Sequence, residues 1–229
     1  MTDKARLNII ARYLDLIGID HVAVPSAADS VDVACGSVAF DVLHKDKELV
    51  KLIDFIGDCR RCRLCEGRRN IVFGTGNPNA PVIFVGEGPG VEEDRRGEPF
   101  VGAAGKRLNV WIKKLGLERE EVYIANIVKC RPPGNRTPRP DEAATCLPFL
   151  ERQIEIIAPK LIVTLGGPAL NYLLGKNERI TRVRGTPLVY GNIPLIPTYH
   201  PAYILRNPQK EKEVFLDLEG IREFLNPRI

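Results

Sequence analysis

Four short runs of apolar residues constrain the fold of this 229-residue chain more than any other feature. They are residues 82–85 (VIFV), 122–124 (VYI), 161–165 (LIVTL) and 193–196 (IPLI). Strands that are apolar along their whole length are typical of a parallel sheet covered on both faces. Amphipathic helical patterns lie between them, at residues 104–115, 141–157 and 168–174. This alternation predicts an α/β fold with three α/β/α layers around a central, mainly parallel, four-stranded sheet.

The stretch before the first apolar run has a different character. Residues 4–17 have apolar positions near helical spacing, residues 22–44 show no clear period, and residues 47–56 form a second amphipathic pattern. We therefore divide the chain into an N-terminal extension, residues 1–50, and one α/β domain, residues 51–229. The extension is expected to hold a helix and an irregular segment.

Composition excludes several classes of protein. Hydrophobic residues make up 44% and charged residues 27%, which is ordinary for a globular protein and excludes a disordered one. No apolar run approaches the roughly 18 residues of a membrane helix, and the first residues lack a secretory signal, so we expect a cytoplasmic protein without a membrane partner. The net charge of +4 permits a nucleic-acid partner. Eighteen prolines are compatible with a thermophilic source.

Five of the six cysteines fall into two groups, Cys59, Cys62 and Cys65, then Cys130 and Cys146. In a reducing compartment, clustered cysteines indicate metal or redox chemistry. Two ligands on a tight turn and two distant ones can close a four-thiolate site for zinc or an iron–sulfur cluster, and the spacing alone does not choose between them. The 67 residues between Cys62 and Cys130 argue against a compact zinc ribbon. Buried free thiols are the structural alternative.

Three polar side chains follow the predicted strands. Glu87 comes after the first run in a glycine-rich loop, Asn126 ends the second run, and His200 comes after the fourth. Carboxyl ends of parallel strands meet at one edge of a sheet, so these side chains are expected to line one pocket. The loop lacks the GxxxxGK[ST] pattern and carries acids, which argues against phosphate binding. The Asn126 amide can both donate and accept, which matches the O4 and N3–H edge of uracil and not that of cytosine.

Taken in order, six stretches of the chain and its cysteine spacing resemble the family 4 uracil-DNA glycosylases, the iron–sulfur class. The stretches are GEGPGVEED (86–94), EPFVG (98–102), IANIVKCRPPGNR (124–136), LIVTLG (161–166), ITRVRG (180–185) and HPAYILRNP (200–208). The resemblance covers roughly residues 55–210 and leaves the N-terminal extension outside the family core. It implies an enzyme that flips deoxyuridine out of DNA and hydrolyses its N-glycosidic bond, releasing uracil and leaving an abasic site. It also implies a structural [4Fe–4S] cluster held by Cys59, Cys62, Cys130 and Cys146.

The resemblance assigns roles in the uracil pocket. Phe100 would stack on the flipped base and Asn126 would read O4 and N3–H. His200 would donate to O2, where negative charge develops as the bond breaks, and backbone N–H groups of the loop around Gly88 would add to this. Glu87 would position the water or the sugar, and Glu93 would lie near C5 of uracil and exclude thymine's methyl group.

The DNA itself needs basic and apolar contacts. Arginines near the motifs suit phosphate contacts, the alternative for each being a solvated basic face, and they are Arg131, Arg136, Arg184 and Arg206. Ile204 or Leu205 would fill the gap left by the flipped base, or else belong to the core. The expected partner is uracil-containing DNA, single- or double-stranded. We expect a monomer, with contacts to replication or repair factors as an open question.

Three alternative functions remain. An electron-transfer iron–sulfur protein would explain the cysteines but not Asn126 and His200 at strand ends. A zinc-stapled nucleic-acid binding module is the second. The third is a superfamily relative that traps the abasic product covalently or removes another deaminated base; the ITRVRG segment lacks the histidine-bearing insertion of the covalent-trapping relatives.

Overall fold

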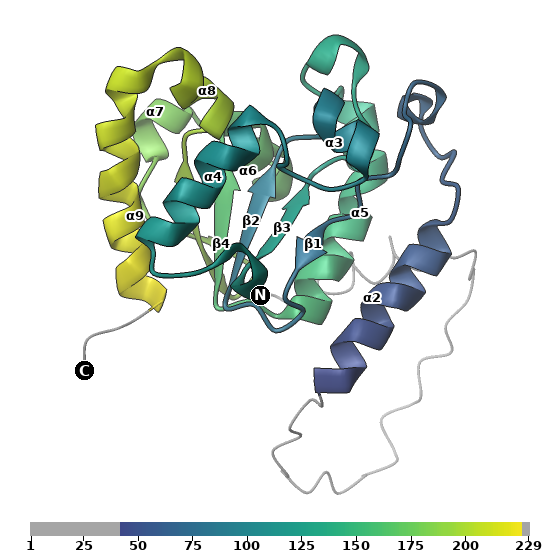
Figure 1. Cartoon of the computed structure of the whole chain (residues 1–229), viewed down its shortest axis with the longest axis horizontal. Coiled ribbons are helices and arrows are strands. Elements are labelled where there is room, and N and C mark those ends of the chain that lie inside the picture. Colours follow the sequence, from purple (N-terminus) through teal and green to yellow (C-terminus); the bar gives the residue numbers. More distant parts are fainter. Residues whose placement is uncertain (1–41, 226–229) are drawn as a thin grey trace, which may run out of the picture.

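A six-stranded sheet forms the centre of the computed structural model, which describes residues 42–225 (Figure 1). The strands are β1 (Thr75–Gly76), β2 (Val82–Gly86), β3 (Tyr123–Asn126), β4 (Leu161–Leu165), β5 (Leu188–Tyr190) and β6 (Ile193–Thr198), in the order β1-β3-β2-β4-β6-β5. The four inner strands β3, β2, β4 and β6 are mutually parallel, whereas β1 and β5 pair antiparallel at the two edges. The four predicted strands and their parallel arrangement are confirmed. Strand β1 is only two residues long (TG) and leaves no apolar run, whereas β5 reads LVY, a run as short as VYI at 122–124, and was not predicted.

Eight α-helices lie in the part of the chain that the structure describes. They are α2 (Val42–Ile56), α3 (Val91–Arg96), α4 (Ala103–Lys114), α5 (Pro140–Ile157), α6 (Gly167–Leu174), α7 (Ile180–Val183), α8 (Pro201–Arg206) and α9 (Glu211–Leu225). The predicted helices at 47–56, 104–115, 141–157 and 168–174 correspond to α2, α4, α5 and α6, and the helix predicted at 4–17 lies outside the described residues. Within residues 42–225, no helix combines the length and the apolar character needed to cross a membrane.

The sheet separates two hydrophobic clusters, as a three-layer fold requires. Successive residues of a strand point to opposite faces, so Ile83 and Val85 of β2 pack into the cluster that α2, α5 and α6 cover. Val82 and Phe84 pack on the other face, in the cluster that α4 and α9 cover. Figure 1 shows α4 and α9 together on one side of the sheet and α5 and α2 on the other. Both faces are dry, which explains the continuously apolar strands.

Helix α2 shows that the predicted division at residue 50 cuts a continuous element. Leu49, Leu52 and Ile56 are buried in the cluster shared with α5. Lys45 Nζ also donates a hydrogen bond to the carbonyl of Ile157, the last residue of α5, at 2.7 Å. The helix from Val42 onward therefore packs as part of the α/β domain.

Candidate functional site

The carboxyl ends of β2, β3 and β6 open into one cleft of about 550 Å³. The structure brings together there all the residues predicted for the pocket, Glu87, Gly88, Glu93, Phe100, Asn126 and His200. Arg136 and Arg206 line it as well. Sequence reasoning missed Thr137 and Tyr203 on the cleft wall, because neither falls at the end of a predicted strand.

His200 is fixed in one protonation form by its place in the chain. It is the residue that caps the N-terminus of α8, and its Nδ1 accepts a hydrogen bond from the backbone N–H of Ala202 at 3.1 Å. The pKa of His200 is lowered to about 4, mainly by burial and also by the positive charge of Arg206, while Glu93 acts in the opposite direction. The ring is therefore neutral at pH 7. Because Nδ1 accepts, the proton lies on Nε2, which is a hydrogen-bond donor.

This protonation form is directly measurable, since the chain has only three histidines. We expect two-dimensional 15N–1H spectra to show a neutral, Nε2-protonated ring for His200 at pH 7 that titrates near pH 4. The folded-state pKa lies below the unfolded value of about 6.5, so His200 contributes stability that is present above about pH 6.5 and is lost as the pH falls towards 4. The spectrum of His200→Gln identifies the signal. A ring that titrates near pH 6.5 would contradict this assignment.

Phe100 lies beside His200, with ring centroids 5.6 Å apart and planes inclined by 34°. Its backbone has a positive φ of 52°, an uncommon conformation for a residue other than glycine. Two glycines make room for it. A Cβ on Gly105 would collide with the Phe100 carbonyl, and a Cβ on Gly86 would collide with both the Phe100 ring and the Asn126 amide oxygen. The site thus depends on bare backbone at two points to hold an aromatic face in the cleft.

Asn126 ends β3 in register with Gly86 of β2, and only 1% of it is exposed. Its side-chain oxygen Oδ1 is buried and has no hydrogen-bond partner among the described residues. Such an atom is rare in folded proteins, because leaving a buried acceptor unpaired costs about 1–3 kcal/mol. The side chain also lines the cleft. Asn126 is therefore placed to accept a hydrogen bond from a ligand.

The two carboxylates of the cleft differ in what holds them. Glu93 Oε1 accepts hydrogen bonds from the backbone N–H groups of Val101 and Gly102, at 2.9 and 2.8 Å. Glu93 thereby fixes the loop that follows Phe100. Burial raises the pKa of Glu87, and a hydrogen bond with Thr137 opposes this. A carboxylate with a raised pKa inside a cleft is typical of groups that exchange protons.

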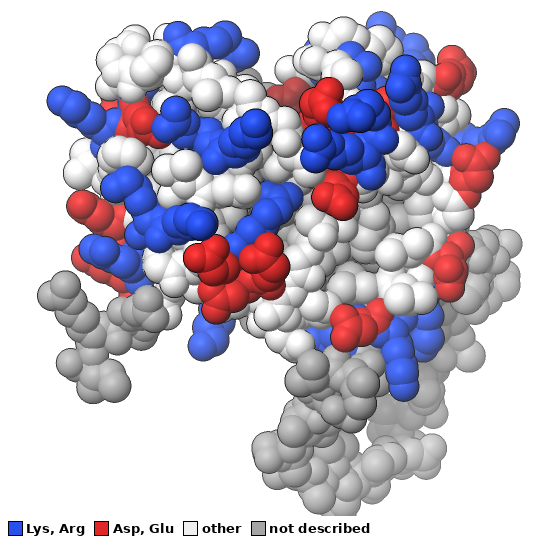
Figure 2. All heavy atoms as spheres, in the orientation of Figure 1, with Lys and Arg blue, Asp and Glu red and all other residues white. Residues whose placement is uncertain are grey.

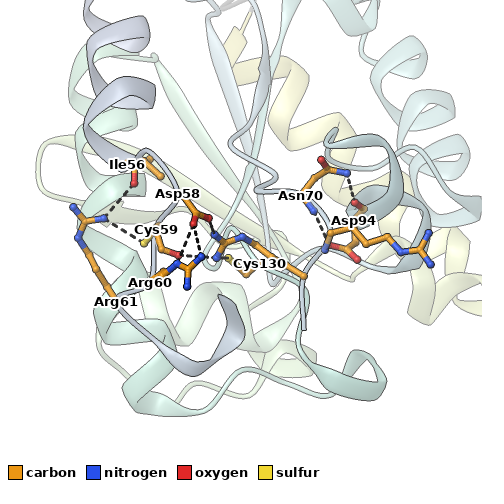
Figure 3. A network of polar contacts seen from close by, with 10 residues as sticks. Ile56, Asp58, Cys59, Arg60, Arg61, Asn70, Asp94 and Cys130 are labelled. Atoms are coloured by element: carbon orange, nitrogen blue, oxygen red, sulfur yellow. Dashed lines mark hydrogen bonds and ion pairs between the residues drawn. The ribbon is translucent and has the colours of Figure 1, made fainter. Parts of the chain in front are cut away.

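Helix α3, which carries Glu93, is tied to the segment that follows the first cysteines (Figure 3). The buried carboxylate of Asp94 accepts hydrogen bonds from the backbone N–H groups of Arg69 and Asn70, at 2.8 and 3.3 Å. The Asn70 amide donates in return to the Asp94 carbonyl at 2.8 Å. The sequence gives no local signal for this pairing, because Asp94 lies 25 residues after Arg69 and 24 residues after Asn70.

Basic side chains border the cleft on more than one side. Figure 2 shows Lys and Arg gathered over the upper part of the molecule, on both sides of a notch. Arg136 makes two hydrogen bonds to the buried Glu142, at 2.7 and 2.8 Å, and Arg131 donates to Asn135 at 2.7 Å. These contacts orient Arg136, which lines the cleft, and tie Arg131 to Asn135, which lines it as well. Their predicted contacts with DNA phosphates stay predictions.

Two predicted DNA contacts need correction. Arg184 faces inwards: its guanidinium donates to Asp217 at 2.7 and 3.1 Å and lies 5.3 Å from the Tyr199 ring centroid, and only 15% of the side chain is exposed. It holds α9 against the sheet, so it is not free to bind phosphate. Ile204 is 1% exposed and belongs to the core. Leu205 is 40% exposed, so it alone of the two can insert into DNA.

The predicted cysteine ligands meet on the other side of the sheet from α4. A small apolar cavity is lined by Cys59, Cys62, Cys65, Cys130 and Cys146, with Ile56 and Phe149 among its walls. The pKa of Cys130 is raised to about 11 and that of Cys146 to about 12, mainly by burial, which outweighs the opposing effects of Arg68 on Cys130 and of Lys129 on Cys146. Such thiols stay protonated unless a cationic group in the cavity favours their thiolate form.

Two arginines contact the cysteines that line this cavity, and Figure 3 labels one of them, Arg61, beside Cys59. Arg68 donates to Cys130 Sγ at 3.5 Å and to the Cys59 carbonyl at 2.7 Å, and it pairs with Asp58. Arg61 donates to Cys59 Sγ at 3.3 Å and stacks over the Phe149 ring, 5.4 Å from its centroid. Cationic N–H donors aimed at sulfur stabilise negative charge on it. Sequence reasoning named neither arginine.

Comparisons with known proteins agree with this geometry. Residues 73–219 match the family model described as the Uracil DNA glycosylase superfamily. The Type-4 uracil-DNA glycosylase of Thermotoga maritima is 46% identical over 188 residues, which cover 80% of this chain and 98% of that protein. The Type-4 uracil-DNA glycosylase of Sulfurisphaera tokodaii is 49% identical over 184 residues, 76% and 84% of the two chains. The Type-5 uracil-DNA glycosylase of Pyrobaculum aerophilum is 28% identical over 144 residues, 56% and 63% of the two chains.

Proposed function

We infer that this chain, which belongs to the uracil-DNA glycosylase superfamily and to its type-4 members, excises uracil from DNA. The observation that carries this inference is the cleft in which an unpaired, buried amide oxygen of Asn126 and a neutral Nε2–H donor of His200 come together. We propose that the reaction is hydrolysis of the deoxyuridine N-glycosidic bond, which leaves an abasic site for base excision repair of deaminated cytosine.

Base recognition uses groups that are already in place. The target base has to leave the DNA stack to reach the cleft, and Phe100 offers it an aromatic face. Asn126 Oδ1 accepts from uracil N3–H, and its amide N–H₂ donates to O4. Cytosine has no hydrogen on N3 and carries an amino group in place of O4. With cytosine in the cleft, the Asn126 oxygen would face the N3 acceptor and the Asn126 nitrogen would face the amino donor. Neither pair can form a hydrogen bond, and this is the basis of discrimination.

Bond cleavage needs stabilisation of the departing uracil. The C1′–N1 bond breaks, its electron pair leaves with N1, and negative charge spreads to O2. The Nε2–H of His200 donates to O2, and a preorganised donor of this kind is worth several kcal/mol in a dry site. Glu87 orients the water that forms the new C1′–O bond and accepts its proton. Glu93 holds the loop behind Phe100, and its predicted role near C5 stays a prediction.

We propose that the cysteine cavity holds a [4Fe–4S] cluster in preference to a zinc ion. Zinc binds each of its thiolates at about 2.3 Å, but among the described residues no three candidate ligands approach closely enough to hold one metal ion. A four-iron cluster takes one thiolate at each of its irons, so its ligands can lie further apart. We propose that Cys59, Cys62, Cys130 and Cys146 hold it. When bound, the cluster supplies a structural cross-link between the end of α2, the segment after β3 and α5.

Loss of a proposed ligand should therefore remove both the colour and the stability of the protein. We expect Cys130→Ser to abolish the visible absorbance and to lower the melting temperature by 10 °C or more, on the order of 2–4 kcal/mol for a domain of this size. Cys65→Ser is the matched control, because Cys65 lines the same cavity but is not a proposed ligand. Iron content, absorbance and thermal unfolding measure the difference. If Cys65→Ser loses its iron while Cys130→Ser keeps it, the ligand set is wrong.

The proposed chemistry is tested by the products. A duplex with one deoxyuridine is incubated with iron-replete protein, and free uracil and the DNA strand are measured separately. We expect uracil in solution and a strand that breaks only after alkali. A stable protein–DNA adduct would instead favour the covalent-trapping relative, and DNA binding without base release would favour a binding module. The expected monomeric state, cytoplasmic location and contacts with repair factors stay predictions.

A further inference from the structure

A fully buried lysine lies directly behind the proposed uracil-reading asparagine. Lys129 is 2% exposed, and its Nζ donates to the backbone carbonyl of Asn126 at 2.9 Å and to Gln153 Oε1 at 2.6 Å. It does not line the cleft. Burying an ammonium group costs several kcal/mol before its interactions repay it, and a well-packed apolar side chain of the same volume is often at least as stable. Packing alone therefore does not account for a lysine at this position.

The side of Lys129 away from the cleft is held rigidly. Gln153, on α5, uses its amide nitrogen to donate to the Phe73 carbonyl at 3.0 Å and to the Tyr123 hydroxyl at 3.2 Å. The orientation of its oxygen towards Lys129 is therefore set by two further bonds. The backbone N–H of Lys129 also donates to Cys146 Sγ at 3.2 Å. One residue thus joins α5, the cysteine cavity and the end of β3.

Asn126 is the last residue of β3, and its carbonyl accepts the hydrogen bond of the Lys129 ammonium. The next two residues still pair with β2, because Ile127 N–H donates to the Gly86 carbonyl and Val128 N–H to the Glu87 carbonyl. The Lys129 ammonium adds a second hydrogen bond to the same peptide plane, because the Asn126 carbonyl and the Ile127 N–H belong to one peptide group. The direction in which the Asn126 side chain leaves the backbone follows from this plane.

We propose that Lys129 is a positioning residue for uracil recognition, which anchors the Asn126 carbonyl to α5 so that the amide faces the base. The inference rests on the proposed function, since it gives Asn126 its role. Misplacing a reacting or reading group by about 1 Å can cost 10²-fold in rate. A residue that acts in this way changes the chemical step and the affinity for free uracil, and leaves the affinity for the DNA backbone unchanged.

The test compares Lys129→Met with Gln153→Met in cluster-loaded protein. Both variants break the same Lys129–Gln153 bond, but only the first removes the donor to Asn126. We expect Lys129→Met to slow single-turnover uracil excision about 10- to 100-fold and to weaken calorimetric binding of free uracil at least fivefold. Gln153→Met breaks the anchor on α5 but keeps the Lys129 donor to the Asn126 carbonyl, so we expect a smaller loss, at most about fivefold in rate and threefold in affinity. Equal losses in the two variants, or losses that follow their melting temperatures, would overturn the proposal.

Two further variants keep the test decisive if Lys129→Met is unstable. Lys129→Met/Gln153→Met removes both ends of the Lys129–Gln153 bond, so neither of these two groups is left buried without the other. It should stay slow if Lys129 positions Asn126 and should recover its rate if Lys129 is only structural. In an Asn126→Ala background, Lys129→Met should have less than a threefold effect, because the group it positions is gone. If wild type does not excise uracil, the proposed function fails; if wild type excises and these patterns do not appear, only the role of Lys129 fails.

Discussion

Replacing His200 by alanine is expected to slow uracil excision by about 10²- to 10³-fold at saturating enzyme, the usual cost of losing one preorganised donor to a developing negative charge. The structure gives the reason. Nδ1 accepts a hydrogen bond from the Ala202 N–H, so the only nitrogen-bound proton of the neutral ring is on Nε2, at the cleft. The ground-state base carries little charge on O2, so the loss falls on the chemical step. Single-turnover rates measure that step, and fluorescence anisotropy of labelled DNA measures binding.

His200→Gln provides the matched comparison, because its amide nitrogen can still donate from a similar place. We expect it to recover part of the rate that alanine loses, with dissociation constants for DNA within about threefold for all three proteins. A loss confined to DNA binding, with an unchanged rate at saturating enzyme, would remove His200 from the chemical step.

Asn126→Asp is expected to slow uracil excision by at least about 10²-fold, although the two side chains have nearly the same shape. The carboxylate still accepts from N3–H, but its second oxygen faces O4 where the amide donated, so a favourable contact becomes a repulsive one. Asn126 is also buried, so the new charge loses its hydration without a partner. Sites built to hydrogen-bond a substrate commonly lose 10⁴-fold or more when a buried pair is mismatched.

Asn109→Asp is a control for this substitution. Asn109 lies on α4 away from the cleft, and its Oδ1 accepts from Arg119 at 3.0 Å, a role that a carboxylate also fills. We expect this variant to excise uracil at the wild-type rate. If Asn126→Asp were equally active, Asn126 would have no part in reading the base.

The inner sheet was predictable because both of its faces are covered. A strand buried on both sides has to be apolar throughout, so β2 and β4 stand out in the sequence as VIFV and LIVTL. Strand β1 has two residues and pairs on one side only, so it leaves no such run. Helix α8 was missed although Pro201 at its first position is a common start signal.

The candidate site also has a part that could be predicted from the sequence and a part that could not. Glu87, Asn126 and His200 were predictable because each follows an apolar run, and a parallel sheet brings such positions to one edge. The supporting contacts depend on tertiary packing and have no local signal. Lysines are mostly found on the surface. Nothing near Lys129 in the sequence indicates that it is buried, because its partner Gln153 lies 24 residues further along the chain. Arg184 was misassigned for the same reason, because Asp217, 33 residues further on, neutralises it inside the fold.

We propose that this cleft recognises and releases uracil. The most direct measurement uses three labelled oligonucleotides that differ only in one base, uracil, cytosine or thymine, under single-turnover conditions with iron-replete protein and alkali treatment. We expect strand cleavage at uracil alone. Cleavage at cytosine or thymine at a comparable rate, or no cleavage of any strand by protein that retains its iron, would contradict it.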